Sequence, residues 1–193
     1  MKRIFIILCL IAMMFSLFAC SLRGSDNGTN NMGNGSLSFT FDAAGNYTGF
    51  DNLPQNYTIE QAIEDGCYVR KGASGEVGGD NWRYFIENSN NKKDTAIRIM
   101  CIFDDATFYT DLFFVDGSYR IFDSSSEDLS DREYKYILEL SGRMPNAERD
   151  SYFAILTDDE TLTFDKVVKS SISSDSVEIR SISPYRLIFA GVV

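Results

Sequence analysis

Residues 96–123, AIRIMCIFDDATFYTDLFFVDGSYRIFD, contain three apolar segments separated by two short polar turns. Strand-favouring β-branched and aromatic residues dominate the segments 96–103, 107–115 and 118–123. The pair Asp116-Gly117 is a strong hairpin signal, because a type I′ turn requires positive φ angles at both central residues. Asp104-Asp105 is predicted to form the other turn. The stretch therefore predicts three sequential antiparallel strands.

Two further strand patterns follow toward the C-terminus, at residues 133–140 and 152–157, around the polar loop 141–151. Five sequential strands with short connections favour a meander with one buried face. We therefore expect an α+β fold: an antiparallel meander sheet of five or more strands, with about three helices packed on one face. Residues 177–182 alternate in polarity and predict another strand, and 186–193 form a last apolar segment.

Helix signals occur at three places in the chain. Thr58 and Gln61 form a capping box for a short helix that stops at Gly66, and a strand is predicted at 67–70. Asp80 is predicted to cap a second helix whose buried face includes Trp82, which we interpret as a core anchor. Thr163 is predicted to cap the third helix. Its apolar face would consist of Phe164, Val167, Val168 and Ile172.

The N-terminus has the pattern of a secretory signal peptide. Met1-Lys2-Arg3 is followed by the apolar run 4–18, which is shorter than the roughly 20 residues of a spanning helix. The tetrapeptide Leu17-Phe18-Ala19-Cys20 resembles the lipobox of bacterial lipoproteins, in which the cysteine receives a diacylglycerol. We therefore predict a lipoprotein signal peptide at 1–19 and lipidation of Cys20; the alternative is an ordinary signal peptide with an incidental cysteine.

The composition of residues 21–36, rich in Gly, Asn and Ser, is typical of a flexible linker. We assign residues 20–56 to a lipid-anchored tether, in which the alternating pattern from Leu37 to Phe50 is either a short hairpin or the end of the tether. Residues 57–193 are predicted to form a single α+β domain. The acyl chains would hold the protein at the membrane, because buried CH₂ groups contribute about 0.8 kcal/mol each.

Charge and composition restrict the classes of partner and of chemistry. The chain has a net charge of −10, which disfavours binding to nucleic-acid phosphates. It has no histidine, so histidine-dependent catalytic triads are excluded and a zinc site is implausible. We predict no cofactor, no resident metal and no catalytic residue.

Two cysteines remain once the signal peptide and the lipidated cysteine are set aside. Cys67 and Cys101 both lie in apolar segments that are predicted to be strands. In an exported domain they could form a disulfide, or both could be reduced thiols in the core, which we favour. Cys67 is a poor candidate nucleophile because no histidine exists to activate it.

Two polar loops are weak candidates for ligand sites. Asp123, Glu127, Asp128 and Asp131 form the best group of oxygen ligands for calcium, but the spacing is not that of an EF-hand, and a solvated acidic loop is the default. The Gly-rich segment 72–79 precedes a helix and could hold an anion, but it lacks the lysine of a phosphate-binding loop.

Several segments, taken in order, resemble a family of small bacterial lipoproteins and secreted proteins known as a domain of unknown function. The segments that carry the resemblance are 57–66, 82–87, 96–99, 112–117, 134–137 and 158–164. The resemblance covers roughly residues 57–182. It implies the α+β architecture and an extracytoplasmic location, and it implies no catalytic residue.

The expected function is that of a non-enzymatic, envelope-anchored lipoprotein that binds a protein, a peptide or an envelope component. The alternative is a carboxylate-dependent hydrolase of the cell envelope, which would need two acids about 5–9 Å apart across a cleft. A third hypothesis is a calcium-responsive module that uses residues 123–131.

Overall fold

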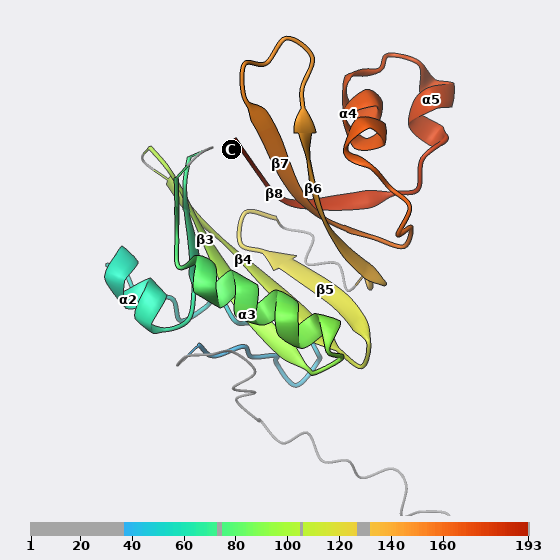
Figure 1. The fold of residues 1–193 in the computed structure, drawn as a ribbon. Helices are drawn as coiled ribbons and strands as arrows, with labels where there is room; N and C mark the ends of the chain where they lie inside the picture. Colours follow the sequence, from blue (N-terminus) through green and yellow to red (C-terminus); the bar gives the residue numbers. More distant parts are fainter. Residues whose placement is uncertain (1–36, 73–74, 105, 127–131, 193) are drawn as a thin grey trace, which may run out of the picture.

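A computed structural model describes residues 37–72, 75–104, 106–126 and 132–192. The fold is α+β, as the sequence predicts, and contains two β-sheets (Figure 1). The larger sheet has the order β2-β1-β3-β4-β5, with β1 Tyr68–Lys71, β2 Gly75–Val77, β3 Thr95–Phe103, β4 Ala106–Val115 and β5 Ser118–Asp123. The smaller sheet consists of β6 Tyr136–Arg143, β7 Asp150–Thr157 and β8 Tyr185–Val192. The helices are α2 Ile59–Glu64, α3 Gly79–Asn90, α4 Phe164–Ile172 and α5 Ser176–Arg180.

The predicted three-strand unit at 96–123 is confirmed as β3-β4-β5. Asp116 and Gly117 have φ angles of 52° and 84°, and Val115 pairs with Ser118 across the two-residue turn. In the hairpin before it, Phe103 pairs with Ala106. These two short turns fix the register of all three strands.

The prediction of one antiparallel meander is wrong in two respects. β1 pairs with β3 in parallel, so the larger sheet is mixed. The chain reaches this arrangement because α3 supplies the long crossover that parallel neighbours require. In addition, β6 and β7 do not continue the meander but pair with β8 in the second sheet.

The helices also differ from the expectation that they pack on one face. Figure 1 shows α3 across the larger sheet and α4 and α5 beside the smaller one. The capping box of Thr58 and Gln61 and the cap at Thr163 are confirmed. Asp80 is not a cap: α3 begins after Gly78, whose φ of 77° suits glycine, and Asp80 lies within the first turn.

The predicted strand at 177–182 is wrong. Residues 176–180 form the short helix α5, and the carboxylate of Asp175 accepts a hydrogen bond from the Val177 amide at 2.8 Å. Val177 and Ile179 are 74% and 44% exposed, so their alternation does not correspond to a buried face. A local turn formed by an aspartate has here outweighed the apolar pattern.

Residues 37–56, which the sequence assigned to the tether, are part of the fold. Leu37, Phe39 and Tyr47 are buried, and a bridge between Phe41 and Tyr47 gives the short hairpin that was one of the alternatives. Their apolar side chains share a core cluster with α2 and with one face of the larger sheet. The folded domain therefore includes Leu37, twenty residues before the predicted boundary at 57. We call residues 37–56 the N-terminal segment.

The opposite face of the larger sheet packs against α3 and the smaller sheet. Trp82 is buried in this cluster, which confirms its role as a core anchor. Its indole Nε1 donates to Glu139 of β6 at 2.8 Å, and the hydroxyl of Tyr152 donates to the same oxygen. Between the two sheets themselves, Arg70 of β1 donates to the Ala190 carbonyl of β8 at 2.8 Å. Polar contacts thus join α3 and β1 to the smaller sheet.

No helix in the described part of the chain is long and apolar enough to cross a membrane.

Replacing Glu139 with alanine removes the acceptor that Trp82 and Tyr152 share. The exposed fraction of Trp82 is only 8%, so its N–H would be left without a partner. We expect the free energy of unfolding, measured by urea denaturation, to fall by about 1–3 kcal/mol. Glu139→Gln keeps a carbonyl oxygen at this place and should retain most of the stability. Equal losses in the two variants would contradict the role of the shared acceptor.

Candidate functional site

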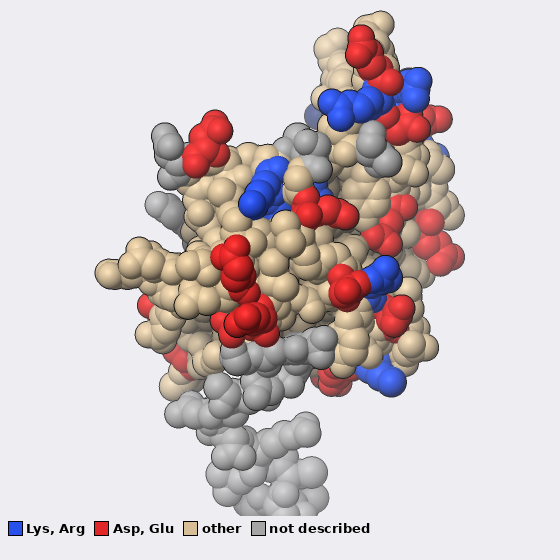
Figure 2. Space-filling view, turned by 60° about the vertical axis from the view of Figure 1, so that its left-hand side comes forward, with Lys and Arg blue, Asp and Glu red and all other residues tan. Residues whose placement is uncertain are grey.

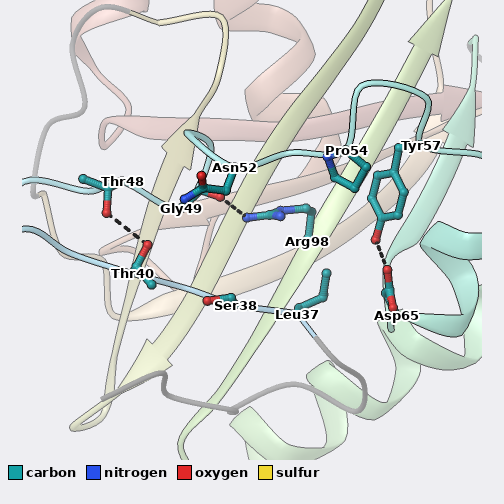
Figure 3. Close-up of a pocket in the computed structure, with 10 residues that line it drawn as sticks. All are labelled: Leu37, Ser38, Thr40, Thr48, Gly49, Asn52, Pro54, Tyr57, Asp65 and Arg98. Carbon is teal, nitrogen blue, oxygen red and sulfur yellow. Dashed lines mark hydrogen bonds between the residues drawn. The ribbon is translucent and has the colours of Figure 1, made fainter. Parts of the chain in front are cut away.

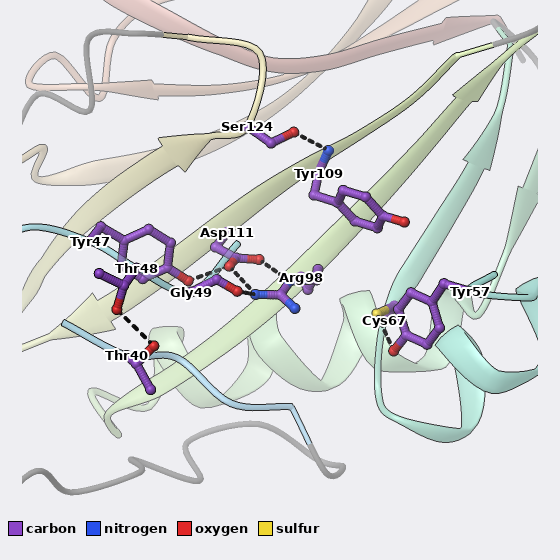
Figure 4. A network of polar contacts seen from close by, with 10 residues as sticks. All are labelled: Thr40, Tyr47, Thr48, Gly49, Tyr57, Cys67, Arg98, Tyr109, Asp111 and Ser124. Atoms are coloured by element: carbon purple, nitrogen blue, oxygen red, sulfur yellow. Dashed lines mark hydrogen bonds and ion pairs between the residues drawn. The ribbon is translucent and has the colours of Figure 1, made fainter. Parts of the chain in front are cut away.

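The central feature of the site is a buried ion pair between Arg98 of β3 and Asp111 of β4. The two residues are direct cross-strand partners in the hairpin register. Arg98 Nε lies 2.7 Å from Asp111 Oδ1, and Arg98 Nη2 lies 2.6 Å from Oδ2 (Figure 4). The exposed fractions of the two side chains are 6% and 0%. Such a pair is stable only if further hydrogen bonds offset the loss of hydration.

Those further hydrogen bonds come from the N-terminal segment. The hydroxyl of Tyr47 donates to Asp111 Oδ2, and the carbonyl of Gly49 accepts from Arg98 Nη2 at 2.8 Å. Gly49 is required at its position, because a Cβ there would collide with the Tyr47 ring. The guanidinium carbon of Arg98 also lies 5.6 Å from the ring centroid of Phe39 and 5.6 Å from that of Phe50. The segment therefore covers the ion pair and is held by it.

The electrostatics of the pair combine burial with hydrogen bonding. Burial raises the pKa of Asp111, while the donors of Arg98 and Tyr47 favour its ionised form. Burial alone would lower the pKa of Arg98, but the hydrogen bonds and charge of Asp111 raise it overall. Burial and the neighbouring Asp111 raise the pKa of Tyr47, which therefore remains a donor. Because three donor contacts converge on one carboxylate, we treat the pair as ionised at neutral pH.

A pocket of about 210 Å³ lies beside the ion pair, between the N-terminal segment and the sheet (Figure 3). Its lining combines hydroxyl, amide and charged groups with a smaller apolar part. The lining residues are Leu37, Ser38, Thr40, Thr48, Gly49, Asn52, Pro54, Tyr57, Asp65 and Arg98. Most of them come from the N-terminal segment, so the pocket depends on how this segment docks.

Arg98 connects the ion pair to the pocket. Its Nε and Nη2 atoms bond to Asp111 and Gly49, whereas Nη1 makes no hydrogen bond to any residue that the structure describes. Arg98 is only 5% exposed, yet it lines the pocket. The N–H groups of Nη1 can therefore donate to water or to a ligand in the pocket.

On the other side of the pocket, Tyr57 joins Asp65 and Cys67. The Tyr57 hydroxyl donates to Asp65 Oδ2 at 2.7 Å and lies 3.7 Å from the sulfur of Cys67. Burial raises the pKa of the Cys67 thiol to about 12. A thiol with this pKa is protonated at physiological pH and is a poor nucleophile.

Cys67 and Cys101 are free thiols in the structure. Cys67 packs with the N-terminal segment on one face of the larger sheet, and Cys101 packs against the cluster on the other face. Because side chains alternate along a strand, two cysteines on opposite faces cannot be bridged without rebuilding the sheet.

The other sequence candidates do not form a site in the described residues. Cys20 lies outside them, as do Glu127, Asp128 and Asp131 of the proposed calcium loop. Asp123 instead accepts hydrogen bonds from Ser125 and faces Arg186 at 3.6 Å. Within the part of the chain that the structure describes, no three potential metal ligands come together. Of the Gly-rich segment, residues 75–77 form β2.

A second pocket, of about 220 Å³, lies at α4 and is lined by Asp159, Leu162, Lys166, Lys169, Ser170, Ser181 and Ile182. Asp159 already accepts hydrogen bonds from Thr161 and Ser183, and Lys166 donates to the Thr161 carbonyl. These contacts use the polar groups locally, so this pocket is the weaker candidate.

The sequence analysis missed Arg98, Asp111 and the N-terminal segment. The available signal was the hairpin register: when 103 pairs with 106, the residues five positions farther from the turn on each strand, Arg98 and Asp111, are also partners. Opposite charges in direct register within apolar strands indicate a buried pair.

Replacing Asp111 with asparagine should strongly destabilise the fold. The variant leaves the buried charge of Arg98 uncompensated, which costs about 3–5 kcal/mol of unfolding free energy. Tyr47→Phe removes one donor to the carboxylate and should cost about 1.5–3 kcal/mol. Urea denaturation at neutral pH measures both. Asp51→Asn, at an exposed position of the N-terminal segment, is the control and should change the free energy of unfolding little. An equally small change in Asp111→Asn would mean that the carboxyl group of Asp111 is neutral in the folded protein.

Native alkylation should leave Cys67 unmodified. With its pKa near 12 and its side chain buried, the thiol should not react with iodoacetamide at pH 8 until the protein is unfolded in urea. Peptide mapping by mass spectrometry, without prior reduction, measures the labelling. Rapid labelling of native Cys67, or a peptide that contains Cys67 bridged to Cys101, would contradict this arrangement.

Comparison of the chain with models of protein families, with curated proteins and with solved structures found no match. The resemblance to a family of small lipoproteins therefore stays a prediction.

Proposed function

We propose that the protein is a non-enzymatic lipoprotein of the bacterial cell envelope that is anchored through a lipidated Cys20 and binds an envelope component in the Arg98 pocket. The observation that carries the proposal is the pairing state of Arg98. This side chain is held by Asp111 and Gly49 and lines the pocket, and its Nη1 makes no hydrogen bond to a residue that the structure describes.

The rigidity of the lining supports the interpretation that the pocket is a binding site and not an incidental surface hollow. A preformed pocket with a few fixed polar groups loses little entropy when its ligand binds. Here the ion pair fixes Arg98. The hydrogen bond between the Thr40 and Thr48 hydroxyls, 3.0 Å long, joins the two arms of the short hairpin. Tyr57 is held in turn by Asp65.

The position of the pocket suits a ligand at the membrane surface. Leu37 lines the pocket, and sixteen residues separate it from Cys20. A fully extended chain spans at most about 3.3–3.6 Å per residue, so the pocket entrance would lie within about 60 Å of an acylated Cys20. An envelope component near the membrane is therefore within reach.

The alternative of a carboxylate-dependent hydrolase has less support at this site. Asp65 supplies the carboxylate of the pocket lining, and Asp111 is already engaged by Arg98 and Tyr47. The two-acid mechanism requires a second carboxyl group that faces the substrate.

The test is capture from detergent-solubilised envelopes, with the full-length protein as bait. We expect one component to be enriched, and Asn52→Trp, which places a large side chain in the pocket lining, to abolish the enrichment. Asn56→Trp, at an exposed residue of the same segment that does not line the pocket, is the matched control. Capture that survives Asn52→Trp would contradict binding in this pocket.

The same material tests the anchor. Wild-type protein should partition into the detergent phase and carry a diacylglycerol on the N-terminal peptide, as seen by mass spectrometry. Cys20→Ala should remain in the aqueous phase once its signal peptide is removed, and it should still capture the ligand. An unmodified Cys20 in wild-type protein would rule out the anchor but not the binding site.

A further inference from the structure

We propose that the ligand of the Arg98 pocket is a neutral, polyhydroxylated group of the size of one sugar ring, such as a sugar unit of an envelope glycan. This inference rests on the proposed function and names the chemical class of its ligand.

The first argument is the size of the pocket. Pockets for drug-sized ligands have volumes of roughly 300–1,000 Å³. At about 210 Å³, the pocket is smaller than these and matches one ring with its substituents. A folded peptide segment or a long acyl chain would not fit inside it.

The second argument is the mixture of hydrogen-bonding groups. Arg98 offers N–H donors, and the amide of Asn52 can both donate and accept. The Thr40 and Thr48 hydroxyls bond to each other and Asp65 accepts from Tyr57, but each of these oxygens has more than one lone pair and can accept a further hydrogen bond. A ligand with a single kind of group, such as a carboxylate, would use only part of this lining. A sugar hydroxyl both donates and accepts, so several of them on one ring can satisfy the whole set.

The third argument is charge. The charge of Arg98 is compensated by Asp111, and Asp65 adds a carboxylate to the lining. The chain as a whole has a net charge of −10, and acidic side chains are spread over the face shown in Figure 2. An anionic ligand would meet a repulsive field. An ammonium group carries donors only and cannot accept a hydrogen bond from Arg98, so a neutral ligand fits best.

The fourth argument is the apolar part of the lining. Leu37, Pro54 and the ring of Tyr57 border the same space in Figure 3. A sugar ring has C–H faces as well as hydroxyls, and amphipathic residues such as tyrosine can contact the apolar face with the ring and a hydroxyl with the tip. Both sides of such a ligand therefore find suitable partners.

The experiment compares three sugars that share one ring and differ in charge: glucose, glucuronate and glucosamine, with N-acetylglucosamine as a second neutral probe. Binding to full-length protein in detergent is measured by saturation-transfer NMR and by the rise in Tm, because a ligand that binds only the folded state stabilises it. We expect one or both neutral sugars to bind, and glucuronate and glucosamine to bind about ten-fold more weakly.

Variants at the rim of the pocket locate the binding without disturbing the ion pair. Asn52→Ala removes one donor and acceptor and should weaken binding about three- to ten-fold, as expected for one net hydrogen bond. Asn56→Ala should leave the affinity unchanged. Both residues are exposed, so neither variant should unfold the domain.

The outcomes separate this inference from the proposed function. Binding of the neutral sugars that falls in Asn52→Ala supports both. If glucuronate or glucosamine binds more tightly than glucose, the ligand is charged and the inference is wrong, while a binding function of the pocket stands. If no sugar binds but capture from envelopes still depends on Asn52, the assignment of a sugar ligand is wrong and the proposed binding function stands. If no sugar binds and capture does not depend on Asn52, the proposed function is wrong as well.

Discussion

The ion pair between Arg98 and Asp111 is the interaction on which the rest of the site depends. An arginine and an aspartate at the centre of a sheet would be costly if each were left to itself. Here they are cross-strand partners, and the hydroxyl of Tyr47 and the carbonyl of Gly49 complete their hydrogen bonds. Because these hydrogen bonds offset the lost hydration of the pair, they favour docking of the N-terminal segment at this one place. The pocket is the space that this docking leaves.

The two faces of the larger sheet have different roles. One face is a conventional apolar layer against α3 and the smaller sheet, with Trp82 and its neighbours. The other face carries Arg98 and Asp111 among apolar residues and is covered by a segment with little regular secondary structure. A sheet covered in this way can present polar atoms to a ligand without exposing its apolar core to water.

Local signals with a specific turn or cap geometry predicted most of their elements, although the cap at Asp80 and the strand at 177–182 were wrong. The Asp116-Gly117 turn, the capping box at Thr58 and the cap at Thr163 specify their elements within a few residues, and they were predicted correctly. The parallel pairing of β1 with β3 and the separate second sheet depend on contacts between distant segments, which no local pattern encodes. The N-terminal segment was assigned to the tether for a related reason: it follows the Gly-, Asn- and Ser-rich stretch 21–36, and only its long-range partners show that it folds. The site combines both cases, since the register that pairs Arg98 with Asp111 is local whereas Tyr47 and Gly49 come from far away in the sequence.

That separation along the chain has a consequence for the order of folding. Tyr47 and Asp111 are 64 positions apart, and Gly49 and Arg98 are 49 positions apart. During synthesis the N-terminal segment emerges first, but it has nothing to pack against until β3 and β4 have followed. Contacts over such distances also form slowly, because the intervening chain must first close a long loop. The aromatic residues of the segment, Phe39, Phe41, Tyr47 and Phe50, thus stay accessible to chaperones and proteases until β3 and β4 are available to cover them.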